Sequence, residues 1–177
     1  MANIISYENN TPEIDESSYI NLHSILIGNV RIGRNCSIWP GAVICAFDNE
    51  IRIGDNVIVM NKSVLTTTDD NPLVISEGSL ISQSAIIKGC RIGKNVLIGK
   101  NANISDGAII GDRSIVYPGT LIFPGQDVPE GKLVSEVPAR ILRDVTDQET
   151  ADVKMQLEKL QEKAQEFGSY YNLSVEE

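Results

Sequence analysis

Branched aliphatic residues recur at every sixth position over a long stretch of the chain. Between residues 92 and 134 they fill each sixth place: Ile92, Ile98, Ile104, Ile110, Val116, Ile122, Val128 and Val134. An α-helix repeats its apolar face about every 3.6 residues and a strand repeats its face at every second residue, so neither element produces a period of six. A hexapeptide period is typical of a parallel β-helix, in which each repeat forms one short side of a coil.

The same period extends upstream, starting near residues 25–32 and continuing through Ile38 and Ile44. Two segments interrupt it, CAFDNE at 45–50 and TTTDDNP at 66–72, and the second has the Asp, Asn and Pro content of a loop. Three hexads make one triangular coil, so the aliphatic residues predict about six coils. Strand spacing places successive coils about 4.8 Å apart.

Small residues occupy the place two positions before most of these aliphatic residues. Cys36 and Cys90 hold this place. We therefore expect both thiols to lie in the core as small apolar groups.

The chain divides into three parts on this pattern. Residues 1–22 are polar and without a clear period, and they are expected to form an N-terminal arm. Residues 23–139 form the β-helix, and residues 140–177 form a linker followed by an amphipathic helix. The ends of a solenoid need covers because each coil buries its aliphatic residues only against the next. The C-terminal helix is therefore expected to dock along the coil or onto a neighbouring subunit.

Start and stop signals delimit this helix. Thr146 and Glu149 have the spacing of a capping box. Gly168 is expected to end the helix. Between them the apolar positions recur at helical spacing: Val153, Leu157, Leu160, Ala164 and Phe167.

The bulk composition excludes several classes of partner. The formal charge of −9 argues against nucleic acid and anionic membrane surfaces. No apolar run approaches the roughly 18 residues that span a bilayer. Three cysteines without metal-type spacing or an even disulfide framework indicate a reducing cytoplasm. No phosphate loop, nucleophile elbow or CxxC motif appears, and no cofactor is predicted.

Four segments together have the order of a known family: IGNVRIGRNCSIWPGAVI (27–44), IRIGDN (51–56), SAIIKGCRIGKNVLIGKNANISDGAIIG (84–111) and GKLVSEVPARILRDVTDQE (131–149). This order resembles the γ-class carbonic anhydrase-like branch of hexapeptide-repeat proteins. The resemblance implies an all-β solenoid, namely a left-handed parallel β-helix with a C-terminal α-helix. It also implies a homotrimer with sites between subunits.

Metal-binding members of that family hold the ion with three histidines, one at the end of a loop and two on the following coil of the neighbouring subunit. The corresponding positions here are Thr66, Gln83 and Lys88. None of these is a usual zinc ligand, and lysine carries a positive charge at neutral pH. The resemblance therefore predicts a divergent member without the metal-binding histidines.

The residues that support the metal in the family also differ in this chain. The family's Arg-Gly-Asp reads Cys45, Ala46 and Phe47, and its Gln-Asp pair reads Met60 and Asn61. The candidate site residues are thus the former metal-cleft positions, and no catalytic residue is assigned: Thr66, Gln83, Lys88, Cys45, Phe47, Met60 and Asn61.

The leading hypothesis is a non-catalytic homotrimer, a pseudoenzyme, that binds a small or anionic ligand in a polar pocket between subunits or acts as a scaffold. In this hypothesis Lys88 contacts the ligand. The alternative role for Lys88 is a salt bridge across the interface to Asp48, Asp69 or Asp70.

Two enzymatic alternatives remain open. Many hexapeptide-repeat proteins transfer acyl groups from coenzyme A or an acyl carrier, and His23 is the only histidine available as a base. Residual carbonic anhydrase or hydratase activity would need other metal ligands, and a cluster of Asp48, Asp69 and Asp70 favours hard cations. A nucleophilic Cys45, activated by Lys88, is a further variant of the enzymatic interpretation.

Overall fold

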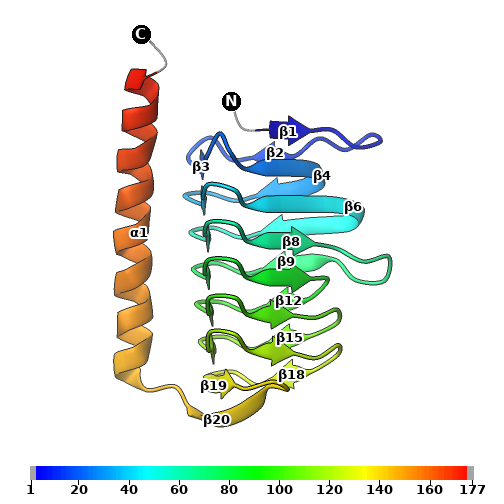
Figure 1. Ribbon diagram of the computed structural model, residues 1–177, viewed down its shortest axis with the longest axis vertical. Helices are drawn as coiled ribbons and strands as arrows, with labels where there is room; N and C mark the ends of the chain where they lie inside the picture. Colours follow the sequence, from blue (N-terminus) through cyan, green and yellow to red (C-terminus); the bar gives the residue numbers. More distant parts are fainter. Residues whose placement is uncertain (1–2, 175–177) are drawn as a thin grey trace.

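The computed structural model describes residues 3–174, which form a triangular solenoid of parallel strands with one long helix beside it (Figure 1). The chain passes through three flat faces in turn, here called faces A, B and C. The turns between them form the AB, BC and CA corners. Face C contains seven parallel strands, one for each coil. The architecture is a left-handed parallel β-helix, which confirms the predicted fold class.

The strands of each face stack in parallel register. Face A consists of β1 (Asn3–Ile5), the first part of β4 (Ile25–Ile32), the first part of β6 (Val43–Ile53), β8 (Val64–Thr66), β11 (Ile86–Lys88), β14 (Asn103–Ile104) and β17 (Leu121–Ile122). Face B consists of β2 (Glu13–Ile14), the remaining parts of β4 and β6, β9 (Leu73–Ile75), β12 (Arg91–Ile92), β15 (Ile109–Ile110) and β18 (Asp127–Val128). Face C consists of β3 (Tyr19–Ile20), β5 (Ser37–Ile38), β7 (Ile58–Val59), β10 (Leu80–Ile81), β13 (Leu97–Ile98), β16 (Ile115–Val116) and β19 (Lys132–Ser135).

The period of six reflects two-residue strands with one side chain inside and one outside. Asn103 is exposed, for example, whereas its neighbour Ile104 is fully buried. Burial of each such aliphatic side chain contributes about 1.5–3 kcal/mol. Cys36 and Cys90 are also buried, which confirms their assignment to the core. Along face A the inward residues stack in one unexposed column: Leu26, Ile44, Leu65, Ile87, Ile104 and Ile122.

The first coil is built from residues that the sequence assigned to an arm at 1–22. β1 and β2 pair with β4, and β3 pairs with β5, so there are seven coils and not about six. The period already runs through Ile14, Ile20 and Leu26 at intervals of six. Ten residues separate Ile4 from Ile14, because a loop is inserted at the AB corner. This insertion hides the first coil from a search for hexads.

The two predicted interruptions differ in structure. Residues 45–50 stay within β6, which runs continuously around the AB corner, and the pairing with β4 shifts register between Gly28 and Val30. Residues 67–72 leave the sheet as a loop between β8 and β9, as the sequence predicts. Both insertions lie at the AB corner, next to the strand ends of face A.

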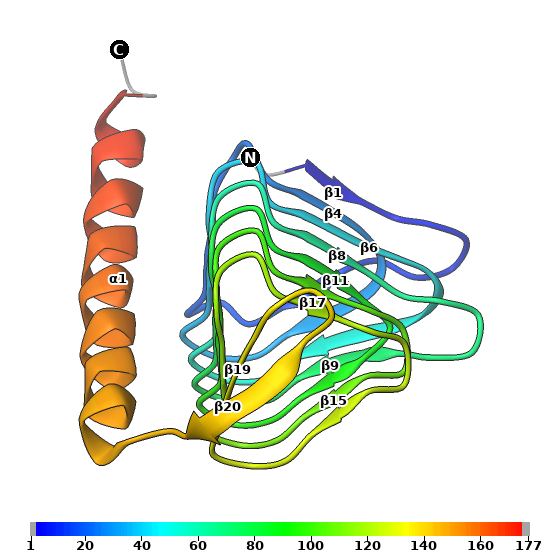
Figure 2. The ribbon, with the colours of Figure 1, turned by 60° about the horizontal axis from the view of Figure 1, so that its bottom comes forward.

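The C-terminal end of the solenoid is closed by β20 (Arg140–Asp144), which pairs antiparallel with β19 and crosses the last coil (Figure 2). The chain then enters α1 (Asp147–Ser174). The capping box is confirmed, because the Glu149 N–H donates to the Thr146 hydroxyl oxygen (3.2 Å) and the Thr146 N–H donates to the Glu149 carboxylate (2.9 Å).

Helix α1 runs back along face C, as the sequence predicts for a helix that docks on the coil (Figure 1). Its residue Leu157 packs with Ile58 and Leu80, which point outward from face C. The prediction that Gly168 ends the helix is wrong, because this glycine does not adopt the left-handed conformation of a C-cap and α1 continues to Ser174. Within residues 3–174, no helix combines the length and apolar character needed to cross a bilayer.

Candidate functional site

Three of the predicted residues form a row at the AB corner of face A. Cys45 on β6 pairs with Thr66 on β8, and Thr66 pairs with Lys88 on β11. Each step is one coil, or about 4.8 Å. The residue before each of them belongs to the buried column of face A, so the thiol, hydroxyl and ammonium groups point outward.

Phe47 lies two residues beyond Cys45, where β6 begins to turn the AB corner. Its ring packs edge-on against Tyr7 of the first coil, with the centroids 5.0 Å apart. Phe47 remains 47% exposed. The two aromatic rings therefore border the upper end of the Cys45–Thr66–Lys88 row.

The other three predicted residues lie at the CA corner. The Ser84 N–H donates to the carbonyl oxygen of Asn61 (3.0 Å), so Asn61 and Gln83 occupy adjacent coils of this corner. The side-chain oxygen of Gln83 is buried and has no hydrogen-bond partner within the described residues. Met60 is 5% exposed and packs with Leu157 of α1, so it belongs to the contact between solenoid and helix and does not line a polar pocket.

The seven residues are thus divided between the two ends of face A. Thr66 and Lys88 are 22 residues apart in sequence but adjacent in space, because those residues complete one coil. Gln83 and Lys88 are only five residues apart, yet they lie at opposite corners of face A, Gln83 in the turn before β11 and Lys88 at the end of this three-residue strand. This grouping differs from the expected one, in which the second and third positions act together from one subunit. A single chain does not bring the seven residues into one pocket.

Within the described residues, no acidic side chain neutralises the Lys88 ammonium group. Lys88 is exposed and forms no ion pair among residues 3–174. Asp48, Asp69 and Asp70 are exposed, and the same part of the chain contains no group of three His, Cys, Asp or Glu side chains arranged to hold a metal ion. The carboxylate cluster considered above is therefore not formed within the single chain.

A polar cluster that no sequence motif marks lies beside Lys88. The Asp106 carboxylate accepts hydrogen bonds from the Thr68 hydroxyl (2.8 Å) and the Asn71 amide (3.0 Å) across the intervening coil. Gly89 permits this approach, because a β-carbon there would lie 2.5 Å from the Asp106 carboxylate oxygen. The cluster holds the 67–72 loop against the coil that carries Lys88.

The thiols of the chain are not activated. Burial raises the pKa of Cys45, and burial together with the nearby Asp106 carboxylate raises the pKa of Cys90 to about 12. A thiol with a raised pKa is a poor nucleophile near neutral pH, because the thiolate is the reactive form. The variant in which Lys88 activates Cys45 therefore has no support in the electrostatics of the chain.

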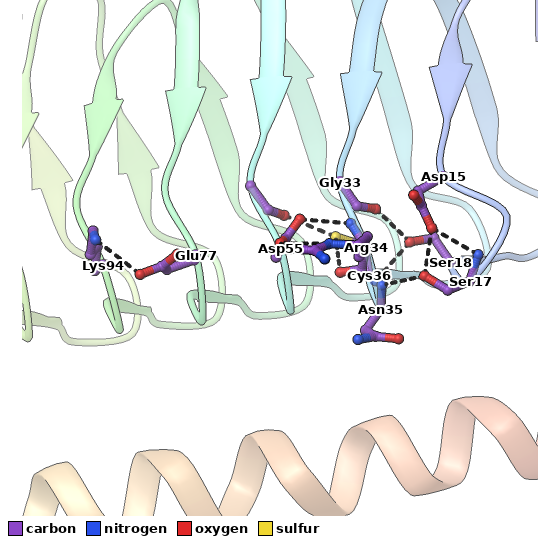
Figure 3. A network of polar contacts seen from close by, with 11 residues as sticks. Asp15, Ser17, Ser18, Gly33, Arg34, Asn35, Cys36, Asp55, Glu77 and Lys94 are labelled. Atoms are coloured by element: carbon purple, nitrogen blue, oxygen red, sulfur yellow. Dashed lines mark hydrogen bonds and ion pairs between the residues drawn. The ribbon is translucent and has the colours of Figure 1, made fainter.

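A network of hydrogen bonds and ion pairs lies elsewhere, at the BC corner facing α1 (Figure 3). Arg34 pairs with Asp55 at 2.7 Å, and Lys94 pairs with Glu77 at 2.9 Å. Hydrogen bonds from the Arg34 backbone and then from its guanidinium lower the pKa of Asp55. A groove of about 680 Å³ runs between this corner and α1, and none of the seven predicted residues lines it. The ion pairs of the BC corner join successive coils, so we interpret them as structural.

Comparison with known sequences supports the repeat and the resemblance. The family "Bacterial transferase hexapeptide (six repeats)" matches residues 89–124. A carbonic anhydrase of Geobacillus kaustophilus is 35% identical over 75 residues, which cover 42% of this chain and 41% of that protein. The aligned part spans less than half the length of the curated relatives that the chain matches, 28% and 41%.

Comparison with solved structures extends over nearly the whole chain. A Bacillus cereus protein assigned provisionally as an acetyltransferase is 30% identical, with a TM-score of 0.94 over 96% of this chain and 98% of that one. A hexapeptide transferase family protein from Anaplasma phagocytophilum is 27% identical, with a TM-score of 0.89 over 93% of this chain and 98% of that one. The fold is thus shared over nearly the whole length of this chain and of both proteins.

Proposed function

Because the chain belongs to the family of hexapeptide-repeat proteins, we propose that it is a γ-carbonic anhydrase-like homotrimer without a catalytic metal. It serves as a binding or scaffold protein with a polar pocket between subunits. The observation that carries this proposal is the division of the predicted residues between the AB and CA corners of face A. In a ring of three copies that turn face A toward the threefold axis, the AB corner of one copy meets the CA corner of the next.

The surface of face A supports such a ring. Apart from Lys88, the outward residues of its described strands carry no charge, and Ile86 is 48% exposed. An exposed apolar surface of this kind marks an interface. At the corners the charges are complementary: exposed Asp69 and Asp70 lie at the AB corner, and exposed Lys62 and Lys100 lie at the CA corner. Opposite charges at the two ends favour head-to-tail closure of the ring.

The pocket formed in this way suits a small anion. Lys88 supplies an ammonium group and Thr66 a hydroxyl donor, and the Gln83 side chain of the neighbouring copy supplies an amide NH2 donor. These groups recognise a small carboxylate through one ionic contact and one or two hydrogen bonds. A thermal-shift titration with acetate and bicarbonate tests this recognition. Stabilisation that Lys88→Gln abolishes supports it, and equal stabilisation of that variant contradicts it.

The metal content of the purified protein tests the central proposal. Histidine and cysteine are the usual protein ligands of zinc, and Thr66, Gln83 and Lys88 supply neither. We expect elemental analysis to find no stoichiometric zinc, iron or cobalt and a mass of three chains in light scattering. Stoichiometric metal bound at the AB corner would contradict the proposed loss of the metal site and would favour the hydratase hypothesis. A monomeric mass overturns the pocket.

Exchanging the charges at the two corners of face A tests the trimeric ring independently of the metal content. Lys62→Glu with Lys100→Glu is expected to weaken the trimer, because it places like charges across the interface. Adding Asp69→Lys and Asp70→Lys should restore assembly. An unchanged trimer in the first variant contradicts the proposed contact between the AB and CA corners.

Acyl transfer is the second candidate function, supported by the similarity to proteins described as an acetyltransferase and a hexapeptide transferase. The only histidine, His23, lies at the CA corner, three coils or about 14 Å above Gln83. Saturating acetyl-coenzyme A at a hundred times its Kd would raise the unfolding free energy by about 2.7 kcal/mol. Acyl transfer is favoured if acetyl-coenzyme A stabilises the protein by this amount and if His23→Ala still binds it but loses turnover. Absence of stabilisation argues against acyl transfer.

We assign the protein to the cytoplasm, because its three cysteines are buried and unpaired. The net charge of −9 makes nucleic acids and anionic membrane surfaces unfavourable partners. No cofactor is proposed.

A further inference from the structure

The N-terminal end of the solenoid leaves one core column uncovered. Ile4 stacks in register on Leu26, at the head of the inward column of face A. Unlike the rest of that column, Ile4 is 47% exposed, since no further coil of the described chain lies above it (Figure 1). The opposite end is different, because β20 crosses it and Ile122 is fully buried (Figure 2). Among the described residues, the inward column of face A is thus left uncovered at the first coil and covered at the last.

The backbone at this end is also open. Within the described residues β1 pairs with β4 alone, so one edge of β1 has unpaired N–H and C=O groups. An uncovered strand edge next to an exposed aliphatic residue is a template for another strand. The outward neighbour Ile5 is 45% exposed and extends the apolar surface over the rim. Helix α1 rises past the first coil and forms a wall on one side of this end (Figure 1).

Acidic residues line one side of the open end, from the loop at the AB corner to the BC corner. Residues 1–30 contain four acidic residues and no lysine or arginine. Glu13 faces Arg31 of the next coil at 3.6 Å, but both side chains are exposed and the pair is weak. The four acidic residues all lie in the first coil: Glu8, Glu13, Asp15 and Glu16. The rim around Ile4 therefore carries a negative charge.

The charge of the rim selects among the occupants of such an edge. Two copies meeting end to end at their first coils would bring the carboxylates of both rims together, and like charges disfavour that contact. A strand rich in lysine or arginine gains attraction from the same rim. We propose that the first coil is a docking surface for an extended, cationic segment of a partner protein, which pairs with β1 and covers Ile4 with an aliphatic side chain.

This docking surface is separate from the pocket between subunits. A trimer would present three such ends on one side, so a partner with several cationic segments would bind more tightly through avidity. The docking itself needs only one chain. Failure of the trimer proposal therefore leaves it intact, and the reverse also holds.

Short synthetic peptides of known chemistry test the proposal on the full chain. The probe is a fluorescent peptide of alternating lysine and valine, and its controls are the same residues in two blocks and an alternating glutamate–valine peptide. We expect the alternating cationic peptide to bind with a salt-dependent affinity and to slow hydrogen exchange of the β1 amides. Equal binding of the block peptide, or protection that lies outside the first coil, overturns strand addition.

Two variants and a matched control locate the site. Ile4→Lys removes the aliphatic contact and adds a repelling charge, and we expect about tenfold weaker binding. If that variant unfolds, Glu13→Gln with Glu16→Gln tests the rim on exposed positions and should weaken binding to a similar extent. Asp127→Asn with Glu162→Gln removes the same charge at exposed positions outside the first coil and should leave the affinity unchanged. An equal loss in this control overturns the assignment. Self-association that Ile4→Lys abolishes also overturns it, in favour of a second copy.

Discussion

Introducing histidine at Thr66, Gln83 and Lys88 should create a metal site that forms only between subunits. Thr66 and Lys88 are one coil apart, about 4.8 Å, so two imidazoles there can both reach one zinc ion at Zn–N distances of about 2.0–2.1 Å. Gln83 lies at the opposite corner of face A, with the three-residue strand β11, roughly 10 Å long, between it and Lys88, so it does not reach that ion within its own chain. The third ligand must therefore come from the next copy.

The magnitude of the effect follows from linkage. Zinc at a hundred times its Kd should stabilise the triple variant by about 2.7 kcal/mol over the metal-free protein. Denaturant unfolding with zinc and with chelator measures this difference, and elemental analysis gives the stoichiometry, expected at one ion per chain.

A single-residue control tests the geometry. In the control variant Lys100→His replaces Gln83→His; Lys100 occupies the same corner one coil further on, so the third imidazole is displaced by about 4.8 Å. We expect zinc to stabilise this control no more than it stabilises the double variant with Thr66→His and Lys88→His alone. Equal zinc stabilisation of the two triple variants, or full stabilisation of a monomer, would refute the reasoning.

Three further predictions concern the fold. Ile110→Ala should cost about 2–5 kcal/mol in denaturant unfolding because it empties a buried position, whereas Ile109→Ala, at an exposed position on the same strand, should cost less than about 1 kcal/mol. Gly28→Ala should destabilise more than Gly119→Ala in the same assay: both have positive φ, but only at Gly28 would a β-carbon overlap a carbonyl of the next coil, and equal losses would contradict this. Hydrogen bonds, first from the Arg143 guanidinium, lower the pKa of Glu149 from 4.5 to about 2. The stabilisation by the Glu149 carboxylate is therefore present above pH 4.5 and lost as the pH falls toward 2. The difference in Tm between wild type and Glu149→Gln should shrink over that range, and a constant difference would contradict the capping role.

The inward and outward positions of the solenoid could be predicted from the sequence because they depend on local alternation. Ile104, for example, is buried and its neighbour Asn103 exposed, as a two-residue strand requires. The first coil escaped prediction because its loop breaks the interval between Ile4 and Ile14. The helix end escaped it because glycine permits a C-cap but does not impose one, and Gly168 stays helical against Tyr19 of the first coil.

The candidate site could be predicted from the sequence only in part. The family motif identified its seven positions, but it did not show that Met60 lies beneath Leu157 of α1. The hydrogen bonds of Asp106 to Thr68 and Asn71 were also hidden, since they cross an intervening coil and no sequence spacing marks them. Contacts of this kind depend on how insertions at the AB corner stack.

The sequence by itself determined the architecture, because a period of six places each aliphatic residue against its counterpart in the next coil and the burial of these residues drives the winding. Only the tertiary structure decided which functional groups meet. It joins Thr66 to Lys88 across one full coil and places Gln83 and Lys88 at opposite corners of face A. The physical reason is that proximity in a solenoid follows the length of a coil and not the distance along the chain.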